Sequence, residues 1–327
     1  MSEHDADLHP VVEETAESVA SMEIRGAATI ADAAAEALAV QARERPTDDA
    51  DRLRAELRLA ARTLHDTRPT AVSLPNALRY VLRGLDDRDA DAIRETVVRR
   101  AERFRRDLES ARDDLGRVGA NRLRDGDTVM FHCHSTDAMA CVESAVESGK
   151  SIDAIVKETR PRNQGHITAE WLQEMDVPVT LIVDNAARRF LDETDHVLVG
   201  ADSIAADGSV VNKIGTSGIA VNARDRGVPM MVAAQTLKLH PETLTGHAVE
   251  IENRAEDEVI DPDDRERIGD VTVENPAFDV TPPRYVDAIV TEKGQFPPES
   301  IVTLMRELYG TDVAEPWERP GGTTRRP

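Results

Sequence analysis

The stretch DGDTVMFHCHSTDAMACVESAVE, residues 125–147, contains the change of pattern that decides the fold. A turn at its start is followed by an apolar run of strand length and then by apolar side chains at helical spacing. The alternation predicts helices at Ala138–Glu147, His166–Met175 and Gly215–Arg226, and strands at Thr128–His132, Ile152–Lys157, Val179–Val183, His196–Val199, Val228–Ala233 and Ala288–Thr291. We therefore expect an α/β fold with a Rossmann-like, mostly parallel, doubly wound sheet covered by helices on both faces.

A different pattern precedes this stretch. Segments rich in Ala, Leu and Arg carry apolar side chains at three- and four-residue steps, which predicts a helical N-terminal domain. The expected boundaries are a flexible N-terminus at 1–10, the helical domain at 11–124, the α/β catalytic domain at 125–315 and a flexible tail at 316–327.

The charge balance restricts the possible partners. The chain has 62 Asp and Glu against 40 Lys and Arg, a net charge of −22, and few of its basic residues are lysines. Such a surface repels nucleic-acid phosphates and anionic lipids, so we expect neither nucleic acid nor membrane as a partner. It is typical of proteins from very salty cytoplasms, where salt screens the self-repulsion. The acidic stretch 250–279 breaks the α/β rhythm and predicts an excursion with Pro262 and Pro276 in its turns.

The sequence lacks the patterns typical of membrane spans, secretion signals, metal or redox sites and common nucleotide-binding loops. No stretch approaches about 18 apolar residues, and the first residues resemble no secretion signal, so we expect a cytoplasmic location. Cys133 and Cys141 do not have the spacing of a zinc or redox site, and the histidines form no HExxH cluster. Neither a GxGxxG fingerprint nor a GxxxxGKS loop is present.

Polar residues follow five of the predicted strands. In an open α/β sheet, ligands bind beyond the carboxyl ends of the strands, so we expect these residues to form the functional edge. They are His132-Cys133-His134-Ser135, Glu158-Thr159-Arg160-Pro161, Asp184-Asn185, Gly200-Ala201-Asp202, and Ala234-Gln235-Thr236 with Lys238 close behind.

The segment 212–218, Asn-Lys-Ile-Gly-Thr-Ser-Gly, is glycine- and hydroxyl-rich and precedes a predicted helix. Free backbone N–H groups at such a terminus can hold a phosphate, although an ordinary helix cap has the same composition. Lys213 favours the phosphate interpretation, because this chain otherwise avoids lysine. Lys238, which follows a predicted buried strand, is a second candidate anion ligand, against the usual role of lysine as a solvated surface group.

Cys133 and Asp202 are the candidate catalytic residues. Cys133 lies between two histidines just before a predicted helix, an environment that favours the thiolate, although a cysteine at a strand end is more often a small buried apolar residue. Asp202 either caps a helix or, in a closed and partly apolar cleft, keeps its proton and serves as a general acid. We assign Cys141 to packing.

From about residue 22 to residue 309, the chain resembles the aldose-1-phosphate isomerases that are related to the regulatory subunits of translation initiation factor 2B. Six ordered motifs carry the resemblance: Arg25-Gly26-Ala27, Arg68-Pro69-Thr70-Ala71-Val72, His132-Cys133-His134-Ser135, Glu158-Thr159-Arg160-Pro161 with Gln164-Gly165, Gly200-Ala201-Asp202-Ser203-Ile204, and Asn212-Lys213-Ile214-Gly215-Thr216.

The resemblance is strongest to the archaeal branch that acts on ribose 1,5-bisphosphate. It implies conversion of that sugar to ribulose 1,5-bisphosphate in the breakdown of AMP and nucleosides, with Cys133 as base, Asp202 as acid and no metal or redox cofactor. It also implies a homo-oligomer, a dimer or an assembly of dimers. The implied substrate-binding residues are Arg25, Gly26, Ala27, Ala28, Arg68, Ser135, Thr136, Asp137, Asn212, Lys213 and Lys238.

Two alternatives remain open within the same resemblance. Methylthioribose-1-phosphate isomerases share the Cys and Asp pair but typically continue the cysteine motif with Asn-Thr-Gly, where this chain has His134-Ser135-Thr136. The initiation-factor subunits lack the pair and are not catalytic. Asp137 departs from expectation, because an acidic side chain stands beside a presumed phosphate loop, where its backbone N–H could still bind.

Overall fold

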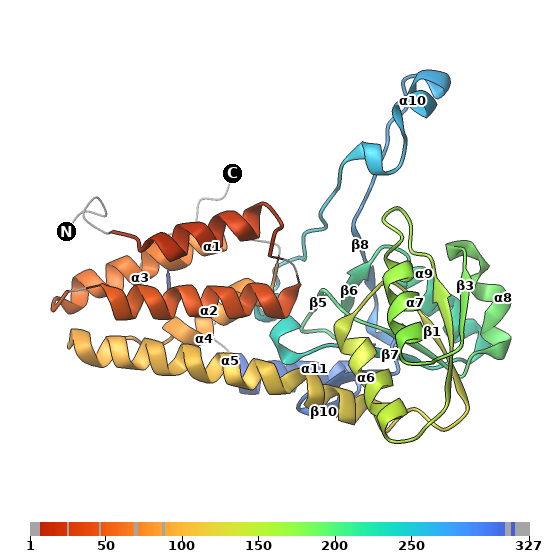
Figure 1. Ribbon diagram of the computed structural model, residues 1–327, viewed down its shortest axis with the longest axis horizontal. Coiled ribbons are helices and arrows are strands. Elements are labelled where there is room, and N and C mark those ends of the chain that lie inside the picture. Colours follow the sequence, from red (N-terminus) through yellow and green to blue (C-terminus); the bar gives the residue numbers. More distant parts are fainter. Residues whose placement is uncertain are drawn as a thin grey trace. The chain divides into compact units, whose positions relative to one another are not determined.

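The computed structural model describes residues 7–24, 26–45, 47–68, 71–86, 89–310 and 315–317 (Figure 1). These residues form two compact units. The first comprises those up to Ser110 together with those after Thr311, and the second comprises Ala111–Thr311. Among the described residues, no helix is long and apolar enough to cross a membrane.

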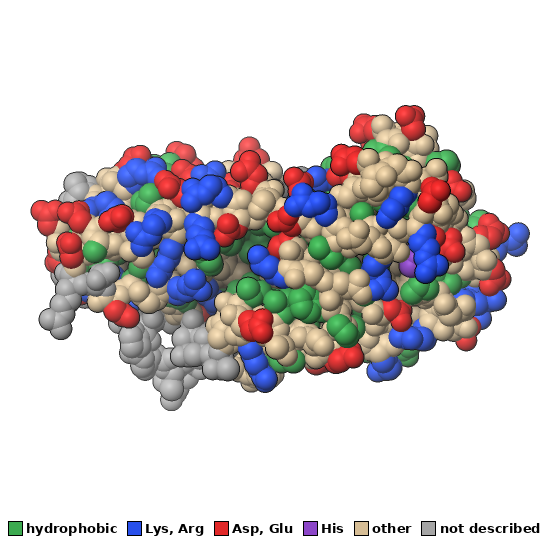
Figure 2. Space-filling view, turned by 90° about the horizontal axis from the view of Figure 1, so that it is seen from below, with side chains coloured by type: hydrophobic (Ala, Val, Ile, Leu, Met, Phe, Trp, Pro, Cys, Tyr) green, Lys and Arg blue, Asp and Glu red, His purple; other side chains and the backbone are tan. Residues whose placement is uncertain are grey.

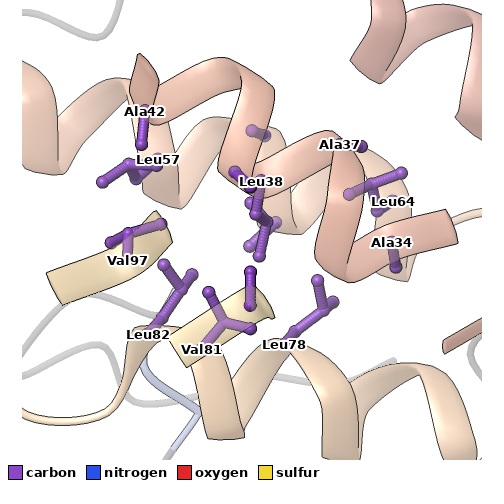
Figure 3. Close-up of a cluster of buried hydrophobic side chains, with 14 of the residues drawn as sticks. Ala34, Ala37, Leu38, Ala42, Leu57, Leu64, Leu78, Val81, Leu82 and Val97 are labelled. Carbon is purple, nitrogen blue, oxygen red and sulfur yellow. The ribbon is translucent and has the colours of Figure 1, made fainter. Parts of the chain in front are cut away.

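The first unit is helical, as the sequence predicts. Its core is built on a helix so rich in alanine that neighbouring helices pack closely against it: Ala34, Ala37 and Leu38 are completely buried. Figure 3 shows Leu38 beside Leu57, together with side chains of the other helices. The helices are α1 (Pro10–Ala20), α2 (Ala27–Glu44), α3 (Ala50–His65), α4 (Ser73–Leu82) and α5 (Ala90–Ala120), and α5 continues into the second unit.

Trp317 differs from the prediction of a flexible tail over 316–327. Its side chain is buried in the core of the helical unit, at 2% exposure. Arg62 Nη1 donates a hydrogen bond of 3.0 Å to its carbonyl oxygen, and the guanidinium of Arg79 lies 5.8 Å from its ring centroid. A large aromatic ring gains more from this burial than the chain end loses in entropy. Residues 318–327, and residues 1–6 of the predicted flexible N-terminus, lie outside the described residues.

The second unit contains the predicted doubly wound sheet. Its strand order is β10-β9-β7-β4-β1-β2-β3, and every pair is parallel except β9 with β10. The six predicted strands are confirmed: β1 (Asp127–Phe131), β2 (Ile152–Lys157), β3 (Val179–Ile182), β4 (His196–Val199), β7 (Met230–Ala233) and β9 (Ala288–Thr291). The short edge strand β10 (Gly294–Phe296) was not predicted.

Helices connect these strands, and their apolar sides bury the sheet in two core clusters. The three helices expected in this unit are confirmed to within about two residues. The helices after α5 are α6 (Thr136–Glu147), α7 (Gln164–Glu174), α8 (Ala187–Phe190), α9 (Thr216–Arg226), α10 (Pro262–Ile268) and α11 (Ile301–Tyr309).

A small antiparallel sheet, missed by the sequence analysis, adds to the same unit. Its order is β5-β6-β8, with β5 (Ser203–Ile204), β6 (Val210–Lys213) and β8 (Phe278–Thr281). The acidic stretch 250–279 projects from the sheets with α10 at its far end (Figure 1) and returns as β8. Pro262 opens α10 instead of lying in a turn, because proline at the first helical position needs no N–H partner.

Candidate active site

The order of the strands points to one crevice. From β1 the chain moves to β2 and β3 on one side, and β4 then lies on the other side of β1. In doubly wound sheets, this reversal opens a ligand crevice at the carboxyl ends of the two strands concerned. Cys133 follows β1 and Asp202 follows β4, so the two predicted catalytic residues flank the reversal.

Two threonines fix the backbone of Cys133, which has a φ of 69° in the left-handed region. The Cys133 N–H donates to Thr159 Oγ1 at 2.9 Å, and the Cys133 carbonyl accepts from Thr168 Oγ1 at 3.0 Å. A left-handed conformation costs about 1–3 kcal/mol at a residue other than glycine and persists only where its surroundings hold it. Thr168 was not singled out by sequence reasoning, because neither its spacing nor its type carries a signal.

The surroundings of Cys133 favour the protonated thiol at neutral pH. Burial raises its pKa to about 11, although Lys213 acts in the opposite direction, and Asp202 raises it further. The expectation that two flanking histidines favour the thiolate is therefore wrong. Burial and Lys157 lower the pKa of His132 to about 4, and burial also lowers the pKa of His134, so neither imidazole is charged at neutral pH.

His132 is buried behind Cys133. Its Nε2 lies 2.8 Å from the carbonyl oxygen of Ile214, so this nitrogen carries the proton and donates. Ile214 directly follows Lys213, and the ring of His132 therefore ties the chain after β1 to the chain after β6.

Lys213, at the end of β6, is a buried cation with 5% exposure. Burial lowers its pKa, as does Arg254, whereas Cys133 and Asp202 raise it. Its Nζ lies 4.8 Å from the ring centroid of Phe278. Lys213 is thus electrostatically coupled to both candidate catalytic residues.

Asp202 is exposed, so of the two alternatives from the sequence the closed, partly apolar cleft is not formed around it in this structure. Its backbone N–H donates to the carbonyl of Val211 at 2.8 Å, which fixes the loop after β4 to β6. Neighbouring Asn212 is buried, and its Nδ2 donates to Thr216 Oγ1 at 3.0 Å.

Asp137 and Lys238 form an ion pair instead of offering two separate ligands. Lys238 Nζ lies 2.9 Å from Asp137 Oδ2, and Asp137 also accepts 2.8 Å and 3.2 Å hydrogen bonds from Nε2 and N of Gln235. Burial opposes the charged carboxyl, but Lys238 and Gln235 outweigh it and lower the pKa of Asp137. The side chain of Asp137 is 1% exposed and committed to these partners, so the backbone N–H is the group of this residue that could still bind a ligand.

The other residues predicted beside Asp137 occupy the start of α6. Ser135 caps this helix by accepting a 3.3 Å hydrogen bond from the N–H of Ala138, and Thr136 is exposed at its first position. The first N–H groups of a helix have no carbonyl partner within it, so this terminus can bind an anion through its backbone.

The predicted phosphate-binding site at the start of α9 is occupied by a carboxylate of the protein itself. Asp279 of β8 accepts hydrogen bonds from the N–H groups of Gly215 at 2.7 Å and Ser217 at 3.0 Å. Burial raises the pKa of Asp279, and these two bonds act against that shift. The helix-cap alternative therefore describes these amides, and Asp279 was missed because it lies more than sixty residues further along the chain.

The remaining predicted ligands belong to the helical unit. Gly26, at a φ of 86°, is the N-cap of α2, and Ala27 and Ala28 form its first turn with no side-chain cap. Arg68 is half-buried after α3. Arg25 lies outside the described residues.

Arg254 is a residue that sequence reasoning missed. It comes from the acidic excursion, and its guanidinium lies 5.8 Å from the same Phe278 ring that Lys213 contacts. It also lowers the pKa of Cys133. Within the described ranges, no group of three or more His, Cys, Asp or Glu residues is arranged to hold a metal ion.

Comparison with known proteins gives a consistent set of relatives. Residues 23–298 match the Initiation factor 2 subunit family. A ribose 1,5-bisphosphate isomerase of Haloferax volcanii is 68% identical over 316 residues, covering 97% of this chain and 98% of the relative. A methylthioribose-1-phosphate isomerase of Acetivibrio thermocellus is 37% identical over 303 residues, covering 86% of each. Among solved structures, a translation initiation factor eIF-2B of Pyrococcus horikoshii OT3 superposes with a TM-score of 0.76 at 30% identity, covering 90% of this chain and 100% of its own.

Proposed function

The chain belongs to the Initiation factor 2 subunit family, and from that premise we propose that it converts ribose 1,5-bisphosphate to ribulose 1,5-bisphosphate. The observation that carries the proposal is the placement of Cys133 and Asp202 on either side of the strand reversal, with the buried Lys213 coupled to both. The 68% identity to a relative with this activity supports the choice of substrate.

In the proposed reaction, Cys133 and Asp202 act as base and acid. The phosphate on C1 blocks the free-sugar route of ring opening. As Cys133 takes the C2 proton, the bond between C1 and the ring oxygen breaks, and that oxygen receives the proton of Asp202. The resulting enol loses its O2 proton while C1 gains one, which leaves a ketone at C2.

The structure of the site suits a base that is strong once ionised. A pKa near 11 makes the thiolate of Cys133 a good acceptor for a carbon-bound proton, while little of it is ionised at neutral pH. Lys213 and Arg254 both lower that pKa, so they favour the ionised form in which Cys133 can act. Neither step calls for a metal or redox cofactor.

We assign substrate binding to the following backbone and side-chain groups. In the α/β unit, the N–H groups at the start of α6 bind one phosphate, with Lys213 and Asn212 contributing side chains. Lys238 also binds the substrate, and its positive charge is partly balanced by Asp137. In the helical unit, the uncapped start of α2 supports a role for Gly26, Ala27 and Ala28. Arg25 and Arg68 complete the proposed set.

The test is incubation of the purified protein with ribose 1,5-bisphosphate in high salt. We expect ribulose 1,5-bisphosphate to form, and Cys133→Ser and Asp202→Asn to reduce its formation by at least about 100-fold. Methylthioribose 1-phosphate in the same assay tests the rival substrate. Function that survives both substitutions would favour the non-catalytic alternative.

We also propose that the protein is a cytoplasmic homo-oligomer. Leu181 of the edge strand β3, Val183 just after it and Ile167 of the adjacent helix α7 are 49%, 59% and 49% exposed. Exposed large apolar side chains on neighbouring elements are typical of association surfaces. Light scattering after size exclusion is expected to give a multiple of 35.9 kDa, and Leu181→Glu with Val183→Glu is expected to shift it toward the monomer.

A further inference from the structure

A cavity of about 310 Å³ is lined by His132, the residue before Cys133. Residues that follow β2 and β3 and residues of α9 form its walls, whereas neither Cys133 nor Lys213 lines it. Nothing in the proposed reaction uses this space.

The charged groups of the cavity wall are mainly cationic. Lys157, Arg160 and Arg188 line it, against the single lining carboxylate of Asp184, and Arg188 is also paired with Asp225 at 2.7 Å. Asp184 is already committed, because its two oxygens accept hydrogen bonds from the N–H groups of Thr159 at 3.1 Å and Arg160 at 2.8 Å. A cationic wall stands out in a chain with a net charge of −22.

Lys157 is the strongest indication of a ligand. It is 3% exposed, and burial lowers its pKa. Two carboxylates, Asp184 and Asp279, raise that pKa against the effect of burial, and the Oδ1 of Asp184 lies 3.8 Å from Nζ, which is longer than a charge-assisted hydrogen bond. A buried ammonium has three N–H donors, and burial without hydrogen-bonded partners is costly. An anion in the cavity would accept these hydrogen bonds at a charge-assisted distance.

The opposite wall leaves room for such a ligand. Gly218 lines the cavity, and a Cβ added to it would meet no atom within 4 Å. Asn222, one turn further along α9, also lines the cavity, and its side chain is held in place by hydrogen bonds to the Gly218 carbonyl at 2.9 Å and from Arg188 Nη1 at 3.2 Å.

We propose that this cavity binds the phosphate group of a small ligand at a site separate from the one that contains Cys133. Free phosphate and a phosphate monoester share the recognised chemistry. His132 and Ile214 both line the cavity and are joined by a 2.8 Å hydrogen bond, so an occupant lies next to the backbone that carries Cys133 and Lys213.

The test is calorimetric titration of the full chain with inorganic phosphate at constant ionic strength, in a Lys213→Met background that removes a proposed cation of the catalytic site. We expect the Lys213→Met variant still to bind phosphate. Adding Lys157→Met to it is expected to weaken phosphate binding at least about tenfold. Loss of all phosphate binding in Lys213→Met alone would overturn the proposal.

A second variant fills the cavity and leaves Lys157 in place, in case Lys157→Met does not fold. Gly218→Leu is expected to abolish phosphate binding in the same background, whereas Val221→Leu, an exposed neighbour on α9, is expected to leave it unchanged. Unchanged binding in Gly218→Leu would also overturn the proposal. Repeating the titration with glycerol 3-phosphate distinguishes the sources, since tighter binding of the ester identifies a phosphorylated metabolite as the occupant.

Discussion

The backbone conformation and the protonation state of Cys133 depend on residues that are distant from it in the sequence. Its position after a strand could be predicted, because the period of the strand and the polarity of the following loop are local signals. Its pairing with Asp202 is implied by the family resemblance and stays a prediction. The left-handed backbone and its two threonine partners could not be predicted, since they arise from contacts across about 26 to 35 residues. Its protonation state also depends on burial, which residue type alone does not give.

Alkylation of Cys133 is expected to follow a pKa near 11. Because only the thiolate reacts, the rate with iodoacetamide should rise about tenfold per pH unit from pH 7 to pH 10. Asp202→Asn is expected to lower the apparent pKa, since its carboxylate raises it, and Lys213→Met is expected to raise it. Cys133→Ser serves as the blank, because the other thiol, Cys141, is buried. An apparent pKa below 8 would contradict the burial argument.

The Asp137–Lys238 pair is expected to contribute to stability. Asp137→Asn leaves Lys238 without its charge partner, and removing one member of a buried pair costs about 3–5 kcal/mol. Because Lys238 keeps 14% exposure, we expect the lower end of that range in urea unfolding. Asp153→Asn, an exposed carboxyl on β2, is the matched control and is expected to change the free energy of unfolding by less than about 0.5 kcal/mol.

The same pair gives a pH dependence with a defined sign. The pKa of Asp137 is lower in the folded protein than in the unfolded chain. Its contribution to stability is therefore present above the unfolded value of about 4 and is lost as pH falls through the folded value. The difference in stability between the native protein and Asp137→Asn should shrink on acidification, and a difference that stays constant to pH 2 would contradict this assignment.

At the scale of elements, the strands of the seven-stranded sheet follow the sequence pattern except for β10, and the strands of the small antiparallel sheet do not. The strands β5 and β10 have two and three residues, too few to establish a period. The acidic excursion shows what composition can and cannot predict. Its composition predicts a departure from the sheet, but it does not reveal that β8 returns to pair with β6 and brings Asp279 to the start of α9.

Asp279 is expected to stabilise α9 as a cap supplied by another element. Asp279→Ala removes both acceptors of the Gly215 and Ser217 N–H groups, and loss of such a cap costs about 0.5–2 kcal/mol. Asp279→Asn keeps one carbonyl acceptor and should recover part of the loss. Urea unfolding measures both variants, and equal stabilities for Ala and Asn would show that the hydrogen bonds do not carry the effect.

At the scale of the whole molecule, the net charge of −22 sets the response to salt. Figure 2 shows acidic and basic side chains intermixed on one face. Many form exposed ion pairs such as Arg99 with Glu95, at 3.4 Å and with both side chains at least 60% exposed. Each such pair is worth about 0–1 kcal/mol and is weakened by salt. The excess of 62 acidic over 40 basic residues adds a repulsion that salt relieves, so the two effects oppose each other.

We expect the relief of repulsion to exceed the loss of ion pairs. At about 0.1 M salt the Debye length is about 10 Å, which leaves neighbouring carboxylates interacting, and at about 1 M it falls to about 3 Å, which screens most of the surface. The free energy of unfolding in urea should therefore rise with KCl over this range. Sucrose at matched osmolality is the control, because it is excluded from the surface without screening charge. If stability were already complete at low ionic strength, the ion pairs would balance the repulsion, and the acidic composition would need an explanation other than screening.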